Sequence, residues 1–203
     1  MRGAGGKGGA EALCKPAAFG RLLVAMRKKL LVLSDTHGYV AALSSVLSWA
    51  KEASPSAAVF LGDGLADLDR ATASAGFSCQ WHKVRGNNDF GFPHPESAVF
   101  DFCGHRFFIC HGHRYNLYRG VETLAGAARA SSAATALFGH IHVPFHEDNN
   151  GLLLVNPGSL GIPRSSLGPT FALIECSPEE PPMPSFWGID PAGSISAISV
   201  GKS

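Results

Sequence analysis

Short apolar runs alternate with amphipathic segments in the first half of the chain. Buried strands are predicted at 30–34, 57–61 and 80–84, because each run is short and is followed by a polar loop that contains glycine. Apolar residues at helical spacing predict helices over 40–52 and 65–75, which end at Ser54-Pro55 and at Gly76. This alternation of strands and helices predicts a parallel sheet with right-handed connections.

The second half of the chain has a different pattern. Hairpins are predicted from 97–103 with 106–110, and from 143–147 with 152–155. A helix is predicted at 122–130, further strands at 134–138, 171–176 and 195–200, and a tight turn at 156–159. The proline-rich stretch 178–184 is typical of a loop. Together the elements favour one α/β domain with two sheets and flanking helices.

Composition is that of an ordinary globular protein. Of the 203 residues, 45% are hydrophobic and 16% are charged, with a formal net charge of +1, which excludes bulk disorder and a coiled coil. A nearly neutral chain also lacks the large basic face of an extensive nucleic-acid binder. No apolar run reaches the length of about 18 residues that indicates a membrane span.

The five cysteines and the first residues bear on compartment and boundaries. The cysteines are irregularly spaced and form no zinc or disulfide pattern, so they are interpreted as buried thiols of a reducing compartment. This interpretation indicates a cytoplasmic protein. Residues 1–25 are rich in glycine and alanine without sustained periodicity, so we expect a disordered extension there and a folded domain over 26–203.

Residues that bind metals follow one predicted strand after another. They are Asp35, His37, Asp63, Asn87, His111, His140 and His142. Because strand ends meet at one edge of a sheet, and buried carboxylates and imidazoles are costly without partners, they predict a metal site. Seven ligands are too many for one ion, which implies two divalent cations bridged by an aspartate. The ligand types favour Mn²⁺, with Zn²⁺, Fe²⁺ or Ni²⁺ as alternatives.

Five ordered motifs carry a family resemblance. D-x-H at 35–37, G-D at 62–63, G-N-x-D at 86–89, H-G-H at 111–113 and G-H-x-H at 139–142 resemble the calcineurin-like metallophosphoesterase pattern, in particular its small YfcE-type phosphodiesterases. The resemblance implies a four-layer α/β/β/α sandwich that hydrolyses a small phosphate ester by attack of a metal-bridging hydroxide. It implies that one ion is held by Asp35, His37, Asp63 and His142. The other ion would be held by Asp63, Asn87, His111 and His140.

The third motif departs from the pattern of many relatives, in which a histidine follows the ligand asparagine. Here that position is Asn88, whose amide can donate a hydrogen bond but cannot give up a proton. His113 is a candidate substitute, or else it only positions the His111 loop. Arg85 is a candidate either for contact with a phosphate oxygen or for pairing with Asp89. The candidate catalytic residues are therefore Asn88, Asp89, His113 and Arg85.

A second function is compatible with the same fold. Vps29-type proteins of the retromer resemble this family in fold but act as protein-interaction scaffolds with a degraded metal site. Here every ligand position holds a competent residue type, which favours the enzyme over the scaffold. The sequence leaves the natural substrate open. The other partner that we expect is a second copy of the chain in a homo-oligomer.

Overall fold

The computed structural model describes residues 27–201, so the extension expected over 1–25 lies outside the described residues. In chain order the elements are β1 Lys28–Leu33, α1 Val40–Ala53, β2 Ala57–Phe60, α2 Leu65–Ala75, β3 Gln80–Lys83, β4 Ser97–Phe102, β5 His105–Cys110, the 3₁₀ turn η1 Leu117–Arg119, α3 Glu122–Ala130, β6 Thr135–Phe138, β7 Pro144–Asn149, β8 Leu152–Pro157, β9 Thr170–Cys176, β10 Met183–Ile189 and β11 Ile195–Ile198. In this part of the chain, no helix has the length and apolar character needed to cross a membrane.

The strands form two sheets. The first has the order β11-β10-β9-β1-β2-β3, and the second has the order β4-β5-β6-β8-β7. The neighbours β1, β2 and β3 run parallel, as the alternation of strands and helices predicts. In the second sheet β5, β6 and β8 are parallel, and the predicted hairpins β4–β5 and β7–β8 are present.

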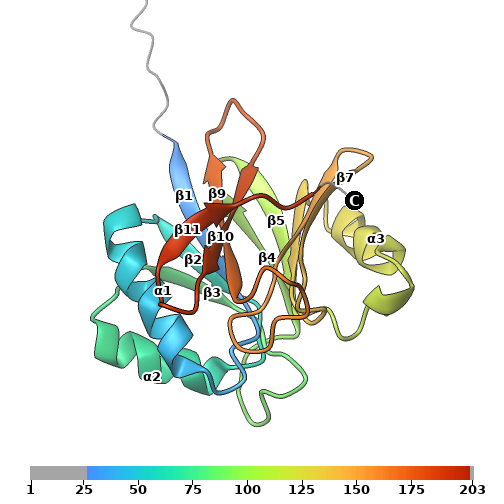
Figure 1. Cartoon of the computed structure of the whole chain (residues 1–203). Coiled ribbons are helices and arrows are strands. Elements are labelled where there is room, and N and C mark those ends of the chain that lie inside the picture. The colour runs from blue at the N-terminus through green and yellow to red at the C-terminus, as the bar shows by residue number, and fades with distance from the viewer. Residues whose placement is uncertain (1–26, 202–203) are drawn as a thin grey trace, which may run out of the picture.

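Three apolar cores separate four layers. Figure 1 shows α1 and α2 covering the first sheet and α3 covering the second. Leu31 and Leu33 of β1 point into the core beneath α1 and α2, whereas Leu30 and Val32 point into the core between the sheets. A third core lies between α3 and the second sheet. Because β1 is buried on both faces, it is apolar at consecutive positions, and the four-layer α/β/β/α sandwich is confirmed.

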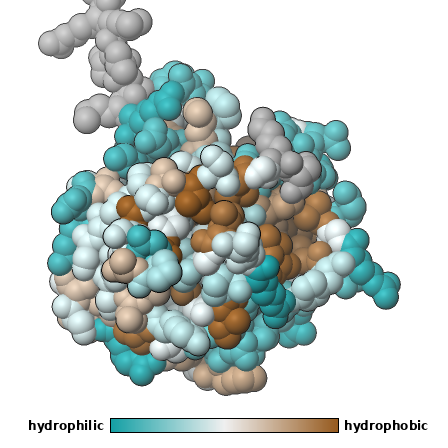
Figure 2. Space-filling model, viewed as in Figure 1, coloured by the Kyte–Doolittle hydropathy of each residue, from teal (hydrophilic) through white to brown (hydrophobic). Residues whose placement is uncertain are grey.

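The loop prediction over 178–184 is wrong at its end, because β10 begins at Met183 and an entire strand was missed. Proline is depleted in strands, since it cannot donate to a sheet ladder. Pro184 is accommodated because it pairs only with β9, and pairing with β11 begins at Phe186. Figure 2 shows apolar residues gathered near the middle of this face, where β10 and β11 lie in Figure 1.

The described cysteines are free thiols. Cys110 and Cys176 are buried, and Cys79 and Cys103 are half-buried. Burial raises the pKa of the Cys79 thiol to about 11, so it is protonated at neutral pH. Burial also raises the pKa of the Cys110 and Cys176 thiols, so these three cysteines pack in the protein as neutral groups.

Candidate metal centre

Five of the seven predicted ligands converge where β1, β2, β5 and β6 end. One compact group is Asp35, His37 and His142, and a second is Asp35, Asp63 and His111. Within each group the nearest ligand atoms lie within 4.8 Å of one another. Oδ1 of Asp35 is 3.1 Å from Nε2 of His142, and Oδ2 of Asp63 is 3.4 Å from Nε2 of His111. Asp35 belongs to both groups and lies at the centre of the cluster.

Hydrogen bonds to Oδ2 orient the Asp35 carboxylate. Oδ2 accepts hydrogen bonds from the Ser34 hydroxyl and from the backbone N–H of His140 at 3.0 Å. Gly139 permits this approach, because a Cβ there would lie 2.1 Å from Oγ of Ser34 and 2.7 Å from Oδ2 of Asp35. The glycine of the G-H-x-H motif therefore brings the two sheets together at the cluster and leaves Oδ1 of Asp35 facing inward.

Two imidazoles are oriented by backbone carbonyls. Nδ1 of His111 lies 2.8 Å from the carbonyl oxygen of Leu61, and Nδ1 of His142 lies 2.7 Å from that of Ile162. A ring nitrogen donates to a carbonyl only when it carries the hydrogen, so in the neutral ring Nε2 presents its lone pair. Histidines that bind metals are held in this way by their second nitrogen.

Burial and charge make the cluster fit a cation. Oδ1 of Asp35 and Nε2 of His111 are buried without a hydrogen-bond partner among the described residues. Burial alone would raise the pKa of Asp35, but the neighbouring imidazoles of His142, His37 and His111 outweigh it and the pKa is lowered. The Asp35 carboxylate, 3.6 Å from Nε2 of His37, raises the pKa of that imidazole. Since orphaned buried polar atoms are costly, the donor set suits a divalent cation with oxygen and nitrogen ligands.

The ligand loops are strained. Positive φ angles occur at Asp35 (56°), His37 (45°), Asp63 (55°), His140 (71°) and His142 (61°). This left-handed region costs non-glycine residues on the order of 1–3 kcal/mol each and is concentrated at functional sites. Aspartate and histidine are among the residues that tolerate it best. The strain therefore coincides with the predicted ligands and indicates that their direction matters.

Asn88, in the G-N-x-D motif at 86–89, orients the Asp63 carboxylate. Its Oδ1 accepts the backbone N–H of Asn88 at 2.8 Å, and its Oδ2 accepts from Nδ2 of the same residue at 2.6 Å. Asp89 lies beneath, buried, and its carboxylate accepts the N–H groups of Asp63, Gly64, Leu65 and Gly86 at 2.7–2.9 Å. The structure therefore places Asn88 against a ligand, and Asp89 beneath the loops.

Arg85 and His113 lie beside the cluster. They line a cavity of about 380 Å³ together with Asn87, which is exposed, and Glu96. Nη2 of Arg85 is 3.3 Å from Oε1 of Glu96, and Nε2 of His113 is 3.8 Å from the same oxygen. Among the described ion pairs, Arg85 therefore meets Glu96 rather than Asp89. His140 contributes its ring at 5.1 Å from that of His111, outside both compact groups.

Three side chains anchor the ligand loops in a way that the sequence did not predict. Asp67, in the first turn of α2, accepts from the Thr36 hydroxyl at 2.6 Å and from the backbone N–H of Gly38 at 2.7 Å. Asn156 donates to the carbonyl of Gly139 at 2.8 Å, and Ser159 donates to that of Asp35 at 2.8 Å. The N-P-G-S stretch was expected to be a turn beneath the site, and in the structure its side chains bind the ligand loops.

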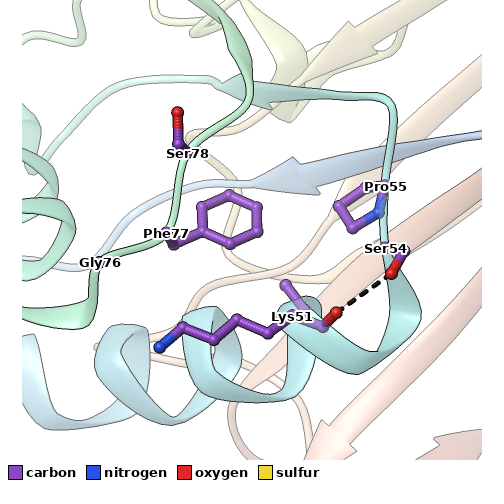
Figure 3. Close-up of a pocket in the computed structure, with 7 residues that line it drawn as sticks. Lys51, Ser54, Pro55, Gly76, Phe77 and Ser78 are labelled. Carbon is purple, nitrogen blue, oxygen red and sulfur yellow. Dashed lines mark hydrogen bonds between the residues drawn. The ribbon is translucent and has the colours of Figure 1, made fainter.

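A second cavity lies at the opposite end of the first sheet, where β2 and β3 begin. Figure 3 shows its lining residues, which come from the ends of α1 and α2 and from the loops that follow them. They are Ala50, Lys51, Ser54, Pro55, Gly76, Phe77 and Ser78. With no carboxylate or imidazole in its lining, this cavity of about 380 Å³ does not compete with the cluster as a metal site.

Sequence comparisons agree with this geometry. Residues 29–179 match the model of the calcineurin-like phosphoesterase superfamily domain. A probable metallophosphoesterase from Mycoplasma pneumoniae is 34% identical over 140 residues, which are 68% of this chain and 82% of the relative. Phosphodiesterase YfcE from Escherichia coli K12 is 27% identical over 168 residues, with 72% and 87% of the two chains covered.

Solved structures share the fold. A predicted phosphoesterase from Streptococcus pneumoniae superposes with a TM-score of 0.68 at 24% identity, over 86% of this chain and 99% of that chain. Vps29 from Entamoeba histolytica in complex with Zn²⁺ superposes with a TM-score of 0.66 at 21% identity, over 85% and 98% of the two chains. At these identities the likeness extends to the fold alone.

Proposed function

Because the chain belongs to the calcineurin-like phosphoesterase superfamily, we propose that it is a metal-dependent phosphodiesterase that acts on a small phosphate ester with two divalent cations. The observation that carries the proposal is the orphaned pair, Oδ1 of Asp35 and Nε2 of His111. Both atoms are buried in a cluster of carboxylates and imidazoles, where a cation would satisfy them.

Two cations are supported by the shared carboxylate. One would be held by Asp35, His37, Asp63 and His142, and the other by Asp63, Asn87, His111 and His140. The compact groups of the structure contain five of these seven residues, and Asn87 and His140 are proposed to complete the ligands of the second ion. The family resemblance makes Asp63 the bridge, and its Oδ2 lies within 3.7 Å of both His37 and His111. The mixed oxygen and nitrogen donors favour Mn²⁺, with Zn²⁺, Fe²⁺ and Ni²⁺ as alternatives.

When bound, two such cations lower the pKa of a water molecule and offset negative charge on a phosphoryl group. The chain itself supplies hydrogen-bond donors around them. The amide of Asn88 can donate to a phosphate oxygen, but it provides no acidic proton. Burial lowers the pKa of His113, so its imidazole is neutral at neutral pH and is a poor proton donor. We therefore propose a preference for esters with good leaving groups.

A scaffold function is the alternative. The Vps29 structures have the same fold, and the one from Entamoeba histolytica is complexed with Zn²⁺. Metal binding alone therefore does not separate an enzyme from a scaffold. Turnover is the property that distinguishes them.

The test combines metal content with turnover. Chelator-treated protein should hydrolyse bis-p-nitrophenyl phosphate only after Mn²⁺ is restored. Asp63→Asn should lower both the rate of hydrolysis and the affinity for Mn²⁺ by more than about 100-fold. Loss of a residue that only supports a metal ligand already lowers metal affinity or activity about 10–100-fold. Asp101→Asn, an exposed carboxylate at the β4–β5 hairpin, is the matched control and should behave as wild type. Folded wild-type protein that binds Mn²⁺ and hydrolyses nothing would reject the enzyme in favour of the scaffold.

A further inference from the structure

Large apolar side chains are exposed around the metal centre. Tyr39 is 58% exposed, Phe90 85%, Tyr118 65% and Ile162 46%. Each lies in a loop that also carries a ligand or an anchor of the cluster: Tyr39 follows His37, for example, and Ile162 provides the carbonyl for His142. Large exposed apolar groups beside a polar centre are typical of a binding site.

Tyr118 differs from its neighbours because its position is fixed. Leu117, the preceding residue of η1, packs against Gly112, where a Cβ would lie 2.6 Å from its Cδ1. The Tyr118 hydroxyl accepts a hydrogen bond from Nη1 of Arg164 at 2.6 Å. The backbone N–H of Arg164 in turn donates to the carbonyl of His142 at 3.0 Å. Loops that follow both β5 and β8 therefore hold this exposed ring in place.

The ring also borders the cluster. Its centroid is 5.7 Å from that of His140, and the His140 ring is 5.1 Å from that of His111. A planar group attached to a phosphorus atom held at the cluster could reach the Tyr118 face. A ring that is already fixed loses little conformational entropy when another ring stacks on it.

We propose that Tyr118 is a specificity-determining stacking platform for a planar ring, such as a nucleobase, on the retained arm of the substrate. The inference rests on the proposed phosphodiesterase function and narrows its substrate class to nucleoside-bearing esters. Tyr118 positions the retained arm, while water adds to phosphorus and the bond from phosphorus to the leaving oxygen breaks.

Two chromogenic substrates with one leaving group test the platform. The p-nitrophenyl ester of thymidine 5′-monophosphate carries a base on its retained arm, and methyl p-nitrophenyl phosphate carries none. Both release p-nitrophenol, so the ratio of their kcat/KM values isolates the retained arm. We expect wild type to favour the thymidine ester on the order of tenfold, mainly through KM, which is the size of one base-stacking contact.

Variants separate the ring from other effects. Tyr118→Leu should bring the ratio close to one, whereas Tyr118→Phe keeps the ring but loses the hydrogen bond with Arg164, so it should give an intermediate ratio. Met183→Ala removes an exposed side chain of β10, at the far end of the first sheet, and is the matched control. A ratio near one in wild type, or a ratio that Tyr118→Leu leaves unchanged, would overturn the platform.

A binding measurement keeps this result distinct from a failure of the proposed function. Saturation-transfer NMR follows the base protons of thymidine 5′-monophosphate with the protein loaded with Zn²⁺, the diamagnetic alternative to Mn²⁺, and does not depend on turnover. Loss of the base signal in Tyr118→Leu but not in Met183→Ala supports the platform even if neither ester is hydrolysed. Equal base signals in wild type and Tyr118→Leu would reject it.

Discussion

The two sheets contribute to the metal centre in opposite ways. Loops after the first sheet carry both carboxylates, and they are held by buried anions, Asp89 and Asp67, that accept backbone N–H groups. Loops after the second sheet carry only imidazoles, and they are held by a neutral amide, Asn156, that donates to a carbonyl. Two buried carboxylates thus anchor the backbone after the first sheet, whereas the buried side chain that anchors the backbone after β6 is a neutral amide.

The difference follows from which backbone groups each loop leaves free. The loop after β2 leads directly into α2, whose first N–H groups have no partner within the helix. No local side chain caps α2, and Asp89 takes that role from a distant loop by accepting the N–H of Leu65. The loop after β6 leads into no helix, and the groups it turns toward the support are carbonyls: that of Gly139 accepts the N–H of Ile141 at 2.9 Å and also the Asn156 amide at 2.8 Å. Four substitutions test this contrast.

The largest effect is expected for Asp89→Ala. It would leave four buried N–H groups unpartnered, so we expect a loss of about 3–5 kcal/mol in the free energy of unfolding, measured with urea. Asp69→Ala is the control, because that exposed carboxylate pairs with Lys83 at 3.3 Å on the surface and its loss should change stability by less than about 0.5 kcal/mol. Similar values for the two variants would show that the N–H groups find other partners.

Gly139→Ala should affect metal affinity more than stability. The new Cβ would collide with the Ser34 hydroxyl and displace the Asp35 carboxylate, so we expect Mn²⁺ to bind about 10–100-fold more weakly by calorimetry. Adding Ser34→Ala removes the closer of the two contacts and should restore part of the affinity. If the double variant binds no better than Gly139→Ala, the collision with Ser34 is not the cause.

Asn156→Ala tests the loops after the second sheet, whose ligands are imidazoles. It removes one of two donors to the carbonyl of Gly139, which keeps the N–H of Ile141, and it leaves the N–H of Gly158 without its side-chain acceptor, so we expect a loss of about 1–2 kcal/mol in the free energy of unfolding. Asn149→Ala, which removes hydrogen bonds near the surface on β7, is the matched control and should cost less. Equal losses would mean that burial of the amide contributes nothing.

Most of the fold was predictable from the sequence because its strands are buried on both faces. Leu30 to Leu33 are apolar without interruption, and α2 ends at Gly76 as predicted. The strand β10 was not predictable from local sequence. Pro184 is tolerated there because β11 does not pair with that part of β10, and this depends on the tertiary structure. Pairing at a sheet edge leaves no local signal.

The ligand residues were predictable as a set, but their support was not. Spacing after strands placed Asp35 and His111 at one edge, and the structure brings them within 3.9 Å. Asp67 gave no signal, because an aspartate in the first turn of a helix is common for local reasons. The positive φ angles and the pairing of Arg85 with Glu96 also depend on contacts between distant loops.

The smallest effect is expected for Asp67→Asn. Its cost in stability should depend on pH, whereas the cost of Asn156→Ala should not. Burial alone would raise the pKa of Asp67, but hydrogen bonds from Thr36 and Gly38 outweigh it, so the pKa is lowered. A lowered carboxylate pKa contributes stability above the ordinary value of 3.8, and that stability is lost as pH falls through the folded-state value. We therefore expect Asp67→Asn to cost about 1 kcal/mol at pH 7 and progressively less below pH 4. The cost of Asn156→Ala, a neutral anchor, should stay constant over the same urea titrations. If both costs followed pH in parallel, charge would not be what distinguishes the two halves of the centre.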